Sequence, residues 1–138
     1  MVHAAVPPPL IALSFHAFGR WIFYPPSSTY RSSPESERHC DLLARTGDPA
    51  RIGYRARQLG RWSGLFRANG TEIDFFSRNL GARAYLIEVS GGGIGRWGLR
   101  RALHPFFAYQ PPRASDAIDP LIDYCLDLVR RGREESEG

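Results

Sequence analysis

Lysine is absent from this sequence of 138 residues, so all 18 basic side chains are arginines. No side-chain amine can therefore form a Schiff base, and no lysine can act as a general base or clamp a phosphate. The arginines are scattered, and only Arg100-Arg101 and Arg130-Arg131 are adjacent. Nucleic acid binds clustered positive charge, whereas this scatter favours a coding preference for arginine. We therefore expect no nucleic-acid partner.

Long apolar runs and closely spaced cysteines are also missing. No segment approaches the roughly 20 apolar residues of a membrane-spanning helix, so we expect no membrane partner. Cys40 and Cys125 match neither a disulfide framework nor a zinc-binding spacing, which favours two small, buried apolar side chains. The N-terminus lacks the basic region and the small-residue cleavage site of a signal peptide, so it indicates no particular compartment.

The composition is that of a folded domain, with 43% hydrophobic and 23% charged residues. A chain of this length fits one domain. We expect an extended, proline-rich segment over residues 1–9, the domain itself over residues 10–131 and a flexible tail over residues 132–138.

Strand and helix patterns alternate along the chain. Apolar runs predict strands at residues 10–15, 21–24 and 84–89, with a further strand near residues 54–59. Capping residues predict helices at 34–46, between Ser33 and Gly47, and at 71–79, with Asp74 in the capping-box position and Gly81 after the end. We expect an α/β fold, a mixed sheet flanked by helices.

The last predicted helix begins at Asp119-Pro120 and ends at Gly132. It carries one apolar stripe at helical spacing, which predicts a face packed on the sheet. The residues of this stripe are Ile118, Leu121, Ile122, Cys125, Leu126 and Val129.

A formal G-x-G-x-x-G motif follows the strand predicted at residues 84–89, with glycines at positions 93, 95 and 98. A dinucleotide site requires this loop to open a helix whose backbone N–H groups hold the pyrophosphate. Here His104-Pro105 would end such a helix after one turn. A chance match in a chain with 14 glycines is therefore the favoured interpretation.

Two polar residues, His16 and Glu88, each end an apolar strand. The four histidines lack the close spacing of metal ligands on one helix face, and His3, His39 and His104 are typical of surface or hydrogen-bonded core histidines. In open α/β sheets, functional groups gather at the carboxyl ends of strands. A carboxylate there has a raised pKa if it is buried, but Glu88 could equally be a surface carboxylate.

The segment Leu13-Ser-Phe-His16-Ala-Phe18-Gly-Arg-Trp-Ile-Phe-Tyr24-Pro25 resembles the region around the third zinc ligand in zinc carboxypeptidases (peptidase family M14). Downstream, Phe66-Arg-Ala68-Asn-Gly70-Thr-Glu-Ile73-Asp74 is similar to the substrate-loop motif of that family, Tyr-x-Ala-x-Gly-x-x-Ile-Asp. Glu88 then falls at the position of the catalytic glutamate in that family. The resemblance covers residues 10–26 and 54–89.

This resemblance implies a role for each matching residue. His16 would be a zinc ligand, and Glu88 would be the general base that deprotonates zinc-bound water and then protonates the leaving amine. Phe18 and Phe66 would line and close the substrate groove, each in place of a tyrosine. Ile73 and Asp74 would belong to the substrate site, and Ile73 suggests an apolar or aromatic C-terminal residue. The implied partner is a peptide with a free C-terminus.

The resemblance is to the C-terminal half of the family only. The first two zinc ligands of the family come from an H-x-x-E motif, which the residues before His16 do not contain. Zn²⁺ is therefore expected only with ligands from a missing N-terminal half. Two interpretations follow, the C-terminal part of a metallocarboxypeptidase or a free-standing, non-catalytic α/β module derived from that scaffold.

Overall fold

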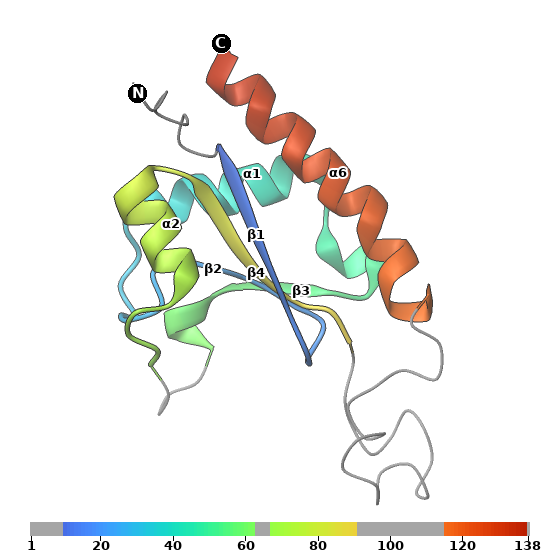
Figure 1. Cartoon of the computed structure of the whole chain (residues 1–138), viewed down its shortest axis with the longest axis horizontal. Coiled ribbons are helices and arrows are strands. Elements are labelled where there is room, and N and C mark those ends of the chain that lie inside the picture. The colour runs from blue at the N-terminus through green and yellow to red at the C-terminus, as the bar shows by residue number, and fades with distance from the viewer. Residues whose placement is uncertain (1–9, 63–66, 91–114, 138) are drawn as a thin grey trace, which may run out of the picture.

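A computed structural model describes residues 10–62, 67–90 and 115–137 (Figure 1). The predicted N-terminal segment 1–9, the glycine motif at residues 93–98 and Phe66 lie outside this part of the chain. The described residues form a mixed α/β fold, in which a four-stranded sheet is flanked by helices. The predicted fold class is confirmed at this level.

The strands of the sheet follow the order β1-β4-β2-β3. β1 and β4 are parallel, β4 and β2 are antiparallel, and β2 and β3 are parallel, so β1 lies at one edge. The strands are β1 (Ile11–His16), β2 (Trp21–Tyr24), β3 (Arg55–Gln58) and β4 (Arg83–Glu88), which confirms all four predicted strands to within one residue or two.

Among the described residues, three α-helices flank the sheet, α1 (Pro34–Thr46), α2 (Glu72–Leu80) and α6 (Ser115–Glu137). The Ser33 hydroxyl accepts a hydrogen bond from Ser36 N at the start of α1, and Thr71 caps α2 in the same way. Short 3-10 helices span Pro49–Ile52 and Leu59–Arg61. Within the described part of the chain, no helix is both long enough and apolar enough to cross a membrane.

β4 is the central element of the core because both of its faces are buried. Tyr85 and Ile87 lie in a cluster with residues of α1 and α6, whereas Ala84 and Leu86 pack with Ile73 of α2. This alternation follows from the two-residue period of a strand. A strand buried on both faces requires a nearly continuous apolar run, which explains why the sequence predicted it correctly.

His39 of α1 is fully buried and hydrogen-bonded at both ring nitrogens. Its Nε2 accepts a bond of 3.0 Å from Ala84 N, so the ring proton is on Nδ1, which donates to Glu35 O at 2.7 Å. Burial lowers the pKa of His39, since a charged ring would lose its solvation. His39 is thus a core histidine that ties α1 to β4.

Helix α6 differs from its prediction at both ends. It begins at Ser115, so Pro120 lies one turn inside it, and it runs through Gly132 to Glu137. Gly132 is a point of close packing and not a helix end, because a Cβ there would lie 2.1 Å from Ile11 Cδ1. Ion pairs from Arg45 and Arg83 to Glu135 hold the last turns. The predicted helix end at Gly132 was therefore wrong, because the helix continues to Glu137 through most of the segment expected to be a tail.

Candidate functional site

His16 and Glu88 are neighbours at the carboxyl ends of two adjacent strands. They are register partners in the parallel pair of β1 and β4, about 4.8 Å apart along the hydrogen-bonding direction. Register partners point to the same face of a sheet, and both side chains line one cavity of about 430 Å³. Both residues were predicted to end strands, and the structure brings them together.

Aromatic and aliphatic side chains form most of the wall of this cavity. The rings of Trp21 and Phe23 stack with centroids 5.4 Å apart, and Phe23 meets Trp62 edge to face at 5.9 Å. Leu59 and Leu86 complete the apolar wall. A cavity of this size and lining suits one apolar or aromatic group, held beside the two polar side chains.

Glu88 has a carboxylate oxygen, Oε2, that is buried without a hydrogen-bond partner among the described residues. Burial raises the pKa of Glu88, and the nearby His16 opposes this rise. Buried polar atoms without partners are rare in folded proteins, and they are found where a ligand or a water completes the site. Glu88 is therefore a candidate general base that faces an apolar cavity.

His16 binds a carboxylate that the sequence analysis did not assign to the site. Its Nε2 lies 2.8 Å from Oε1 of Glu72, at the first turn of α2, and 3.0 Å from Ser14 Oγ. Ser14 Oγ also donates to Glu72 Oε1 at 2.9 Å. Burial raises the pKa of Glu72, but hydrogen bonds from its own backbone N–H, Ser14 and His16 lower it further, so that it lies below its usual range.

These three side chains are not a serine-nucleophile triad. In such a triad the histidine uses one ring nitrogen for the serine and the other for the acid. Here Ser14 and Glu72 both contact Nε2 of His16. Ser14 and Glu72 instead orient the imidazole ring of His16 through its Nε2 atom.

The other residues predicted for the substrate site divide into two groups. Phe18 lines the cavity and is 43% exposed, in agreement with a position at its rim. Ile73 is fully buried and packs with Phe23 and Leu86, so it lies behind the cavity wall and does not line it. Phe66 lies outside the described residues.

Asp74 is buried, does not line the cavity of His16 and Glu88, and holds a loop. Its two carboxylate oxygens accept hydrogen bonds from Ser27 N at 3.0 Å and Ser27 Oγ at 2.5 Å. The predicted capping-box position is correct in that Asp74 N donates to Thr71 Oγ1, but the carboxylate points to Ser27. Its place in the structure is that of a loop anchor.

The described residues do not complete a zinc site. No group of three or more His, Cys, Asp or Glu side chains among them could hold a metal ion. His16 has the features of a single ligand, since metal-binding histidines usually donate their second ring N–H to an oxygen such as that of Glu72. Any further ligands must come from outside this part of the structure.

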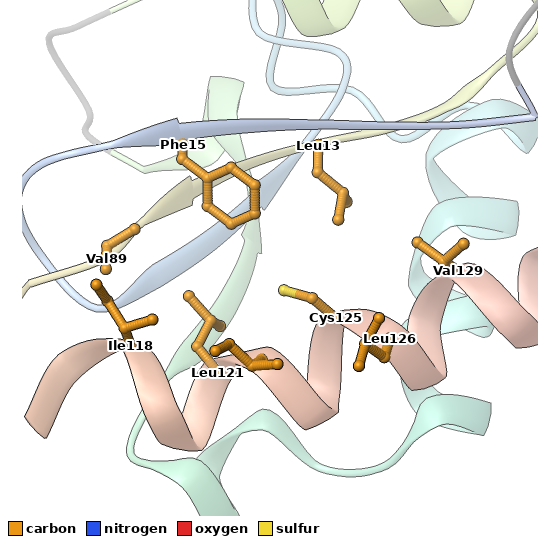
Figure 2. A pocket seen from close by; sticks show the side chains of 9 residues that line it. Leu13, Phe15, Val89, Ile118, Leu121, Cys125, Leu126 and Val129 are labelled. Carbon is orange, nitrogen blue, oxygen red and sulfur yellow. The ribbon is translucent and has the colours of Figure 1, made fainter. Parts of the chain in front are cut away.

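A second cavity, of about 420 Å³, lies on the other side of β1, between this strand and α6 (Figure 2). Its lining is apolar throughout, from Leu13 and Phe15 of β1 to Leu126 and Val129 of α6. Cys125 is the single nucleophile among its described lining residues, and burial raises the pKa of that thiol to about 11, so it is protonated at neutral pH. The reactive groups therefore gather in the first cavity.

All six residues of the predicted helix stripe line this second cavity, and four of them are exposed, whereas Leu121 and Cys125 are buried. The prediction of buried cysteines is confirmed for Cys125 and wrong for Cys40, which is exposed.

Comparisons with known proteins leave the family open. No family model matches the chain, and no curated protein matches its sequence.

Proposed function

We propose that this chain is the C-terminal part of a zinc-dependent metallocarboxypeptidase, which removes one residue from the free C-terminus of a peptide. The observation that supports this most strongly is the pairing of His16 and Glu88 in register at one end of the sheet. A second supporting observation is the Glu88 carboxylate oxygen, which has no hydrogen-bond partner among the described residues and lies with His16 at an apolar cavity.

In this proposal each part of the site has one task. The cavity walled by Trp21, Phe23 and Trp62 takes the apolar or aromatic side chain of the C-terminal residue. Phe18 packs against that side chain from the rim. Glu88 accepts a proton from the attacking water and returns it to the leaving amine, because its raised pKa brings it closer to the pKa values of those groups.

A zinc ion, when bound, would supply an acidic water molecule and polarise the carbonyl. Of the described residues only His16 is assigned to it, and the remaining ligands are assigned to an N-terminal half that carries H-x-x-E. We expect the chain by itself to bind zinc weakly and to hydrolyse no peptide. The residues of this chain then contribute substrate binding and proton transfer.

The alternative is a non-catalytic module derived from the same scaffold. It is supported by the pairing of His16 with Glu72 and by the lack of a three-ligand group among the described residues. Both interpretations predict an apolar binding cavity. They differ in whether a complemented chain hydrolyses a peptide bond.

Peptide binding to the chain tests the cavity. Trp21 and Trp62 line it, so their fluorescence should change when an N-blocked dipeptide ending in Phe binds. We expect at least about tenfold weaker binding for the same dipeptide ending in Asp, because an apolar pocket does not solvate a carboxylate. Ala68→Phe, which fills the cavity, should abolish binding, whereas Ala44→Phe on the exposed surface of α1 should not.

Hydrolysis tests the chemistry. After addition of an N-terminal half with H-x-x-E and of zinc, the wild-type chain should cleave the dipeptide ending in Phe. Glu88→Gln should keep the fold and the bound zinc but lose about 10²–10⁴ in rate, because an amide cannot accept the proton. Near-normal activity of Glu88→Gln would remove the catalytic assignment. An inactive complemented wild type that still binds the dipeptide would establish the non-catalytic alternative.

A further inference from the structure

The hydrogen bonds around His16 determine which ring nitrogen carries its proton. Glu72 Oε1 and Ser14 Oγ both lie within 3.0 Å of Nε2. A glutamate carboxylate accepts hydrogen bonds and has none to donate, and the Ser14 hydroxyl already donates its one hydrogen to Glu72 Oε1. Neither oxygen has a proton to give to Nε2. In neutral His16, therefore, Nε2 carries the proton and donates it.

We propose that Glu72 is a positioning residue, which together with Ser14 holds His16 in the Nε2–H tautomer and leaves Nδ1 with a free lone pair. Glu72 is well placed for this task. It occupies the first position of α2, where the helix dipole stabilises a carboxylate, and Thr71 caps that helix. Its contact joins α2 to the end of β1, two elements that are 56 residues apart in sequence.

His39 provides an internal contrast. The hydrogen bonds of His39 place its ring proton on Nδ1, because Nε2 accepts a hydrogen bond from the backbone N–H of Ala84. The neutral forms of the two histidines in the described residues should therefore be opposite tautomers. The two imidazole rings are chemically identical, so the difference in tautomer comes from their hydrogen-bond partners.

The consequence for the site rests on the proposed function. With Nε2 held by Glu72, a metal ion can bind His16 only through Nδ1. Carboxylates that accept the second N–H of a metal-binding histidine make it a better ligand, and their loss typically costs 10- to 100-fold in metal affinity. Glu72 would thus support the ligand without touching the metal.

Nitrogen NMR of the whole chain tests the tautomer directly. Long-range proton–nitrogen correlation at pH 8 distinguishes a protonated ring nitrogen from one with a lone pair. The variants are Glu72→Ala, the conservative Glu72→Gln and, as a matched control, Glu37→Ala in the first turn of α1. Zinc chloride is then titrated into each protein, and the Nδ1 resonance of His16 is followed.

We expect a single Nε2–H tautomer for His16 in the wild type and in Glu37→Ala, a mixture in Glu72→Ala, and partial recovery in Glu72→Gln, whose amide oxygen can still accept. A mixed or Nδ1–H wild type, or an unchanged Glu72→Ala, would overturn the positioning role. Zinc should shift Nδ1 of the wild type at lower concentration than Glu72→Ala, by about tenfold or more. A wild-type His16 with the expected tautomer and no response to zinc would contradict the proposed function, but it would support the positioning role.

Discussion

Replacement of Asp74 by alanine should destabilise the fold strongly. The carboxylate is 6% exposed and accepts two hydrogen bonds from Ser27, which is itself fully buried. A hydrogen bond to a charged group contributes about 1.5–3 kcal/mol, and a buried N–H left without a partner costs about 1–3 kcal/mol. Relaxation of the loop offsets part of this loss. We expect a decrease of about 3 kcal/mol in the free energy of unfolding.

Urea unfolding followed by tryptophan fluorescence measures this decrease. With a slope of about 1.5 kcal/mol per molar, the midpoint should fall by about 2 M urea. Asp74→Asn should lose less, about 1–2 kcal/mol, because the amide keeps one acceptor for Ser27 N. The control is Asp127→Ala, whose carboxylate is half-exposed on α6 and pairs with the exposed Arg130, so its change should stay within about 0.5 kcal/mol.

The same experiment separates the structural role of Asp74 from the substrate role that the family resemblance implies. If Asp74 bound substrate, Asp74→Ala would unfold like the control but would lose affinity for the dipeptide ending in Phe. Equal midpoints for Asp74→Ala and Asp127→Ala would therefore refute the reasoning from the hydrogen bonds of Ser27.

The remaining predictions concern the core. The lowered pKa of His39 means that the unfolded chain takes up a proton first, so stability should fall as pH drops below about 6.5, by up to about 1.4 kcal/mol per pH unit. Urea midpoints between pH 7.5 and 5 measure this, and the same slope in His39→Gln would contradict it. Gly60→Ala should cost about 2–3 kcal/mol, because its Cβ would meet Thr29 O at 2.1 Å. Gly132→Ala should lower the melting temperature by less than Gly60→Ala does, since the new Cβ meets the movable end of the Ile11 side chain. A larger decrease for Gly132→Ala than for Gly60→Ala would refute this.

Local signals in the sequence were sufficient for most of the fold. Ser33 and Thr71 mark helix starts because their hydroxyls satisfy backbone N–H groups within the same turn. The run of β4 reads as a strand because both of its faces are buried. His16 and Glu88 were found for a related reason, since a polar residue at the end of an apolar strand stands out without knowledge of the partner strand.

Contacts between distant segments were beyond local signals. In the sequence, Gly132 resembles the residue that ends a helix. In the structure it packs against Ile11 at the start of β1, where there is little room for a larger side chain. Glu72 looked like one acidic residue in a first helical turn, the usual preference at that position. Only the packing of α2 beside β1 brings it to His16. The resemblance assigned Asp74 to substrate, whereas its partner, Ser27, lies 47 residues away.

The two carboxylates near His16 differ in a way that separates their roles. Burial raises the pKa of Glu88, whose Oε2 has no partner among the described residues. Glu72 has three hydrogen-bond donors, so its pKa is lowered in spite of burial. When two acidic groups in one site have their pKa values pushed apart, the one with the higher value is suited to exchange protons and the other remains ionised. In the proposed function, this difference assigns proton transfer to Glu88 and leaves to Glu72 the charge that would orient His16.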